Sequence, residues 1–157
     1  MNIRQANLKD ANHISELISD LALKYIAPNC TSEGLNLLIR SMKPEMIAQY
    51  MSTNCLYHII EENNQIAGVI AIRDNSHLFH MFVAAEFQGK GLAKILWHHA
   101  REICLKNGNT GTFTVNSAIN AKSVYLKLGF KPISAIRTHK GILDIPMTLK
   151  LAAADNN

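Results

Sequence analysis

The chain has 157 residues, of which 48% are hydrophobic and 18% charged, and this composition favours one globular domain with a buried core. Its formal net charge of +4 comes from lysines and arginines that form no basic stripe, so no nucleic-acid partner is expected. No apolar run approaches the roughly 20 residues that cross a bilayer, and residues 1–5 lack the apolar segment of a secretory signal. We therefore expect a cytoplasmic protein with no membrane partner.

The three cysteines, Cys30, Cys55 and Cys104, follow no metal-ligand spacing. Each is expected to act as a small buried hydrophobic residue and not as a nucleophile. The sequence therefore indicates no metal site and no cysteine-based catalysis.

The first third of the chain predicts one short strand followed by helices. Ile3 opens the strand, and Asp10 offers an N-cap to a helix whose apolar residues recur at helical spacing: Ile14, Leu17, Ile18 and Leu21. A second helix is expected after Thr31, and Pro44 suits the first turn of a third. This region also supplies acidic candidates to attract a cationic substrate: Glu16, Asp20, Glu33 and Glu45.

The rest of the chain alternates between strands and helices. Strands are expected at residues 55–61, 65–73, 77–83, 112–115, 130–136 and 142–149, and helices at 91–106 and 120–128. Because proline cannot donate to a sheet ladder, Pro146 predicts that the last strand lies at an edge or carries a bulge.

The order of these elements predicts the fold class. Early hairpins followed by strand–helix alternation favour an α/β fold with a central mixed, largely antiparallel sheet of six to seven strands flanked by helices. We expect a single domain over residues 1–151 and a loose tail at residues 152–157.

The segment from Gln88 to Ala93 joins the end of a strand to the start of a helix. Unpaired N–H groups and the positive end of the helix dipole meet there, which predicts an anion site. Gly89 and Gly91 let the backbone approach a phosphate, and Lys90 adds a positive charge. The alternative is a plain helix start whose glycines serve only the turn, because short glycine motifs are common by chance.

These six residues, Gln88-Gly89-Lys90-Gly91-Leu92-Ala93, resemble the Gln/Arg-x-x-Gly-x-Gly/Ala signature of the GNAT N-acetyltransferase superfamily. Residues 121–130 read Ala-Lys-Ser-Val-Tyr-Leu-Lys-Leu-Gly-Phe and resemble that family's Ala-x-x-x-Tyr-x-x-x-Gly-Phe segment. The resemblance spans roughly residues 55–135, with the elements in the expected order. It implies the acyl-CoA N-acyltransferase fold and acetyl-CoA as cosubstrate, without a metal.

The resemblance also implies how acetyl-CoA is held. Main-chain groups of Met81, Phe82 and Val83 would hold the pantetheine arm and polarise the thioester carbonyl. The pyrophosphate would be held by Gln88, Gly89, Lys90, Gly91, Leu92 and Ala93. Many family members place a CoA-contacting Asn seven residues before the tyrosine, and here that position is Ala118. Asn120 is the candidate to reach the cofactor instead, or it simply caps the helix.

Tyr125 stands at the family's proton-donor position, five residues before Phe130. A phenol with a pKa of ~10 stays protonated at neutral pH and can donate to the leaving thiolate. The alternative is that Tyr125 is an amphipathic core residue of a short helix.

His77 is the candidate general base, because several family members carry a His or Glu six residues before the position of Val83. An imidazole with a pKa of ~6.5 suits this work at neutral pH. The alternatives are that its ring lies on a half-buried strand face, or that Glu61 or Glu62 orders a water that acts as the base. His77 and His80 lie three residues apart and should leave opposite faces of a regular strand, which argues against a zinc pair.

The resemblance implies an N-acetyltransferase that moves an acetyl group from acetyl-CoA to a primary amine of a small molecule or peptide by direct attack in a ternary complex. An alternative from another class is a non-catalytic acyl-CoA-binding sensor or regulatory module. A dinucleotide-binding protein is disfavoured, because no Gly-x-Gly-x-x-Gly follows an early strand. Dimers are frequent in the superfamily, so a homodimer is an open alternative by analogy.

Overall fold

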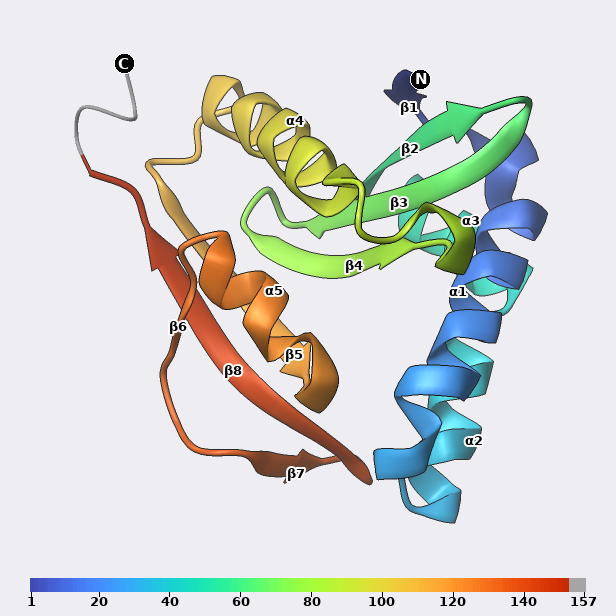
Figure 1. Ribbon diagram of the computed structural model, residues 1–157, viewed down its shortest axis with the longest axis vertical. Helices are drawn as coiled ribbons and strands as arrows, with labels where there is room; N and C mark the ends of the chain where they lie inside the picture. The colour runs from blue at the N-terminus through green and yellow to red at the C-terminus, as the bar shows by residue number, and fades with distance from the viewer. Residues whose placement is uncertain (153–157) are drawn as a thin grey trace.

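The computed structural model describes residues 1–152, which form an eight-stranded sheet with helices on both faces (Figure 1). The strands are β1 (Asn2–Gln5), β2 (Cys55–Glu62), β3 (Gln65–Arg73), β4 (His77–Val83), β5 (Thr112–Ala118), β6 (Lys131–Pro132), β7 (Arg137–His139) and β8 (Ile142–Lys150). Their order across the sheet is β1-β2-β3-β4-β5-β8-β6, and β7 also pairs with β8. Only β4 and β5 run parallel among the described pairs, which confirms the mixed, largely antiparallel sheet. Of the expected tail, residues 153–157 lie outside the described part of the chain.

The α-helices begin close to the residues that the sequence indicates. They are α1 (Ala11–Tyr25), α2 (Ser32–Ser41), α3 (Pro44–Ser52), α4 (Leu92–Lys106) and α5 (Lys122–Lys127). The Thr31 hydroxyl caps α2 by accepting from the Gly34 N–H at 3.0 Å, and Pro44 occupies the first turn of α3. Within residues 1–152 no helix combines the length and the apolar character needed to cross a membrane.

Strand β3 lies in the middle of the fold and packs on both faces. Val69 and Ala71 join the core formed with α1 and α3, whereas Ile70 and Ile72 join the core formed with α4 and α5. Successive side chains of a strand point to opposite faces, so this almost continuous apolar run is buried on both sides. The bounds predicted for β3 and β4 are confirmed.

Pro146 changes the C-terminal half of the sheet in a way that the sequence did not predict. Strand β8 is not an edge strand, because it pairs with β5 on one side and with β6 and β7 on the other. The Pro146 carbonyl accepts from the Ile133 N–H at 2.9 Å, so the missing N–H of the proline faces the same side. The strand expected at 130–136 is therefore interrupted there and is reduced to β6, while β7 is a further short strand beyond the expected bounds, which raises the count to eight.

Strand β4 pairs with β5 only through its first two residues, His77 with Thr114 and Leu78 with Val115. Beyond these two pairs the strands diverge, and the sheet opens into two halves (Figure 1). At the far end the halves meet again, where the Thr31 N–H donates to the Gly141 carbonyl at 2.9 Å. A Cβ on Gly34 would overlap that carbonyl, so α2 and the turn before β8 are in close backbone contact.

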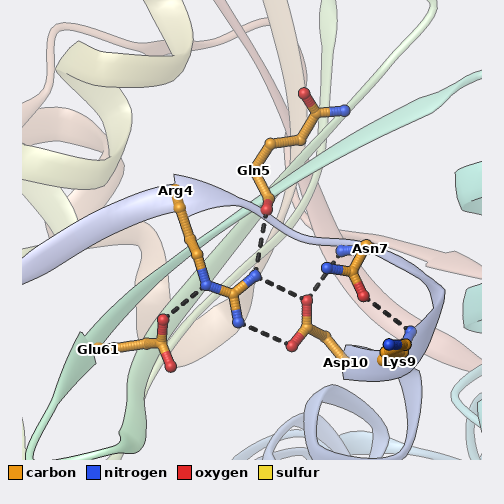
Figure 2. Close-up of polar contacts among 6 residues, drawn as sticks. All are labelled: Arg4, Gln5, Asn7, Lys9, Asp10 and Glu61. Carbon is orange, nitrogen blue, oxygen red and sulfur yellow. Dashed lines mark hydrogen bonds and ion pairs between the residues drawn. The ribbon is translucent and has the colours of Figure 1, made fainter.

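An ion-pair network ties the first strand to the rest (Figure 2). Arg4 in β1 donates from Nε to Glu61 Oε1 at 2.6 Å and from both terminal nitrogens to the Asp10 carboxylate at 2.9 Å. Asp10 also accepts from the Asn7 N–H at 2.8 Å. The hydrogen bonds from the Arg4 guanidinium hold the pKa of Asp10 below its ordinary value of 3.8.

We expect Asp10→Asn to lower the free energy of unfolding by about 1 kcal/mol at pH 7, because Arg4 is partly exposed and keeps Glu61 as a partner. The folded-state pKa of Asp10 is depressed, so its contribution is complete above 3.8 and is lost as the pH falls through the folded value. Urea unfolding of both proteins from pH 7 down to about pH 2 measures how far the difference between their free energies of unfolding shrinks as Asp10 becomes protonated. Asp20→Asn, at an exposed position without an ion pair in the described chain, is the control and should change nothing. A deficit for Asp10→Asn that does not depend on pH would contradict the assignment.

Candidate active site

A cavity of about 950 Å³ occupies the opening between β4 and β5. Ten of the residues predicted for the site lie on its lining: Met81, Phe82, Val83, Gln88, Gly89, Gly91, Leu92, Ala93, Asn120 and Tyr125. Lys90 and His77 do not line it. The structure thus brings both sequence motifs to one cavity, although they lie on opposite sides of the opening between β4 and β5.

The start of α4 presents a row of main-chain N–H groups without acceptors. The first α4 amide with an acceptor in the described chain is that of Ile95, which donates to the Gly91 carbonyl at 3.2 Å. The amides of residues 89–94 make no hydrogen bond within residues 1–152, and no side chain caps the helix. These amides and the positive end of a 15-residue helix form a site for an anion.

Two glycines shape this site. Gly89 and Gly91 both have φ of 79°, in the left-handed region that other residues rarely adopt. A Cβ placed on either would meet no atom within 4 Å. The backbone therefore faces open space here, and a phosphate can approach it without contact with a side chain.

The open edge of β4 offers a second set of main-chain groups. The Ala84 N–H donates to the Ala67 carbonyl of the neighbouring hairpin strand at 2.8 Å. Because main-chain groups alternate along a strand, those of Phe82 also point to β3, while those of Met81 and Val83 point into the opening. The Val83 carbonyl accepts from Gln88 Nε2 at 3.0 Å. The N–H and C=O of Met81 and the N–H of Val83 are left to bind a ligand, and Phe82 contributes its ring.

A β-bulge in β4 places two aromatic side chains on the wall of the cavity. The partner of Ala71 is His80 and the partner of Ile72 is Leu78, so Phe79 is the extra residue. The bulge puts Phe79 and His80 on one face, where their rings stack with centroids 4.1 Å apart. His80 Nδ1 lies 3.0 Å from the Tyr57 hydroxyl, and burial lowers the pKa of His80 to about 3. Its ring is therefore neutral at physiological pH.

The structure places His77 outside the cavity, where its Nδ1 lies 2.7 Å from Thr114 Oγ1. The flanking residues Phe113 and Val115 join the α4-side core, so Thr114 and His77 point to the other face. The expectation that His77 and His80 leave opposite faces is wrong, because the bulge between them reverses the alternation. Among residues 1–152, no group of three or more His, Cys, Asp or Glu side chains is arranged to hold a metal ion.

Tyr125 lies in α5 and is buried, with 7% of its surface exposed. Its ring packs edge-on against Phe130, with centroids 5.8 Å apart. No group in residues 1–152 makes a hydrogen bond with its hydroxyl, and burial raises its pKa above the ordinary value of 10.0. The phenol is therefore protonated at neutral pH and free to donate into the cavity.

Two further predicted residues have protein partners. Asn120 lines the cavity, but its Nδ2 donates to the Tyr25 carbonyl at the end of α1 at 3.1 Å. The Lys90 ammonium lies 5.4 Å from the centroid of the Phe87 ring at the mouth of the anion site.

Sequence reasoning missed Tyr50 and Arg73, which also line the cavity. Tyr50 lies on α3 and donates its hydroxyl to the Ser41 carbonyl at 3.0 Å, with its ring 5.0 Å from that of Phe79. Arg73 ends β3. Neither belongs to a motif, so only the packing of the helices against the sheet reveals them.

A mixed sheet opened between two parallel strands, with a helix N-terminus at the opening, is the architecture of acyl-CoA N-acyltransferases. Solved structures share it. A GCN5-related N-acetyltransferase from Rhodopseudomonas palustris has a TM-score of 0.81 at 16% identity, over 96% of this chain and 95% of the other. The PaiA N-acetyltransferase from Thermoplasma acidophilum, solved in complex with coenzyme A, has a TM-score of 0.77 at 20% identity, over 96% of this chain and 98% of the other.

The family description "Acetyltransferase (GNAT) domain" matches residues 26–151, and the chain belongs to this family. N-acetyltransferase 8F1 of Rattus norvegicus is 23% identical to it over an alignment of 122 residues, which covers 71% of this chain and 55% of the relative. The chain therefore spans about half the length of this curated relative.

We expect Gly91→Ala to weaken the binding of a diphosphate-bearing probe, coenzyme A, by roughly tenfold or more. The methyl group enters the space that the amides face and strains a φ of 79°. Calorimetric titration measures the dissociation constant. Gly108→Ala is the matched control, because Gly108 has φ of 98° and open space at the other end of α4. Equal losses of affinity in the two variants would contradict the location of the anion site.

Proposed function

We propose that this chain is an N-acetyltransferase that moves an acetyl group from acetyl-CoA to a primary amine of a small molecule or peptide. One observation carries the proposal. A single cavity joins the free amides at the start of α4, the open edge of β4 and the protonated hydroxyl of Tyr125. Cofactor binding through the diphosphate, polarisation of the thioester carbonyl and protonation of the leaving sulfur are three tasks of acetyl transfer from acetyl-CoA, and each has a group on this lining.

The residues present fit acetyl-CoA. The amides of Gly89 to Ala93 suit its diphosphate, because they are free and no Cβ stands in front of the two glycines. The main-chain groups of Met81 and Val83 suit the amides of the pantetheine arm, since they lie on an unpaired strand edge. The structure of the PaiA N-acetyltransferase in complex with coenzyme A, which has the same fold, supports the assignment.

Bound acetyl-CoA supplies an activated acetyl thioester. The free N–H of Met81 or Val83 is a fixed donor for the carbonyl oxygen, which gains negative charge as the amine attacks. The N–C bond forms as the C–S bond breaks, the sulfur takes a proton from Tyr125, and the amine loses one. The attack is direct, in a ternary complex, because the lining of the described chain holds no cysteine, and the hydroxyl of its serine, Ser41, donates to the Leu38 carbonyl at 2.7 Å.

Two histidines of β4 are candidates to accept the proton that the amine loses. The role predicted for His77 stays a prediction, and it requires the ring to leave Thr114 and turn toward the cavity. The histidine on the lining is His80, whose neutral ring can accept a hydrogen bond from an amine N–H. With a pKa of about 3 it orients the amine better than it removes its proton.

We expect Tyr125→Phe to lower kcat for thiol release from acetyl-CoA by about a hundredfold, because the leaving sulfur loses its proton donor. The dissociation constant of acetyl-CoA should stay the same, since the hydroxyl does not contact the anion site. Tyr25→Phe removes a phenol from another part of the same lining and serves as the control, with kcat within about twofold of wild type. Tight binding of acetyl-CoA without turnover of any amine by the wild type would favour the sensor alternative.

A further inference from the structure

The charges on the cavity wall are few and uneven. Within the described chain the lining holds one cationic side chain, Arg73, and one carboxylate, Asp144. Asp144 is already neutralised, because its Oδ1 accepts from Arg137 Nε at 2.7 Å. The wall that receives the acceptor therefore carries a net positive charge.

Arg73 has no anionic partner among residues 1–152. It takes part in none of the four ion pairs and donates no side-chain hydrogen bond. Its guanidinium lies over the Phe79 ring, with Cζ 5.1 Å from the centroid. This contact orients the planar group and leaves its five N–H donors for a ligand.

The acidic residues that would recognise a polycationic acceptor are elsewhere. Glu16 and Asp20 line a second cavity of about 500 Å³ between α1 and the turn from β2 to β3. Glu33 and Glu45 are exposed and line neither cavity. A polyamine would place its further charges against Arg73 and apolar side chains, without a carboxylate to bind them.

We propose that the acceptor is an amine that also carries a carboxylate, such as an amino acid with an apolar side chain, and that Arg73 binds this carboxylate. The inference rests on the proposed N-acetyltransferase function. A guanidinium and a carboxylate match in a two-bond geometry. Apolar and aromatic residues of the same lining receive the side chain of the acceptor: Leu38, Met42, Tyr50 and Phe79.

The position of Arg73 agrees with this assignment. The ring beneath its guanidinium is that of Phe79, the bulge residue of β4, which lies two positions before Met81, so Arg73 lies over the same strand that presents Met81. Met81 supplies the open edge where the thioester is expected. A compact acceptor can therefore bind Arg73 with its carboxylate while its amine reaches the reacting carbon.

The test compares matched acids and amides as acceptors: phenylalanine, leucine and methionine, each against its carboxamide, with spermidine as a polycation. Thiol release from acetyl-CoA gives kcat/KM, expressed per neutral amine because the amide has the more acidic ammonium. We expect the wild type to prefer at least one acid over its amide by tenfold or more. In Arg73→Gln we expect kcat/KM for the acid to fall until the preference is gone, while kcat/KM for the carboxamide stays within twofold of wild type. Arg73→Lys should keep part of the preference.

Arg40→Gln is the matched control, because Arg40 is an exposed arginine of α2 that does not line the cavity. An unchanged dissociation constant for acetyl-CoA shows that each variant is folded. Equal use of acids and amides, a preference for spermidine, or an equal loss for both substrates in Arg73→Gln would overturn the inference and leave the proposed function intact. No thiol release with any of these amines would overturn both.

Discussion

The architecture depends on the point where β4 and β5 stop pairing. Two residue pairs hold these parallel strands together, and beyond them the main-chain groups of Met81 and Val83 have no neighbouring strand. An unpaired polar group inside a protein costs about 1–3 kcal/mol, so an opening of this kind survives only if the rest of the fold holds it and something uses it. The α4-side core contains residues of both halves, and the contact of α2 with the turn before β8 joins them again at the far end.

The bulge at Phe79 gives the two ends of β4 different tasks. Before the bulge the strand is an ordinary partner of β5, with Leu78 in the α4-side core. After it the alternation is reversed, so that Phe79, His80 and Phe82 face the cavity wall that α3 supports. One inserted residue thus builds an aromatic wall beside a free backbone edge. Bulges are common next to active sites because they re-aim side chains without breaking the sheet.

Much of this fold could be predicted because its strongest signals are local. The apolar runs of β3 and β4 and the periodicity of α4 fix those elements within a residue or two. The motif from Gln88 to Ala93 likewise depends on consecutive residues, and the structure places it where a strand meets a helix.

The rest could not be predicted because it depends on contacts distant in sequence. Pro146 leaves its own strand, β8, continuous and interrupts the pairing on the side of β6 and β7. The sequence does not show which strands lie next to β8. The sequence of β4 gives no sign of the bulge at Phe79. Spacing alone therefore selects His77 as the general base, although its ring contacts Thr114. Arg73 is recognised as a candidate ligand-binding residue only from the structure, which shows that it lines the cavity and that Arg137 is paired with Asp144.

The central claim is that the main-chain amides at the start of α4 bind the diphosphate of coenzyme A. Titration of the ¹⁵N-labelled protein with coenzyme A, followed by amide NMR, tests it most directly. The account predicts that the amide resonances of Gly89, Gly91 and Ala93 move most, while those of Gly108 and Gly129 stay in place. Saturable binding that leaves the first three unmoved would contradict it.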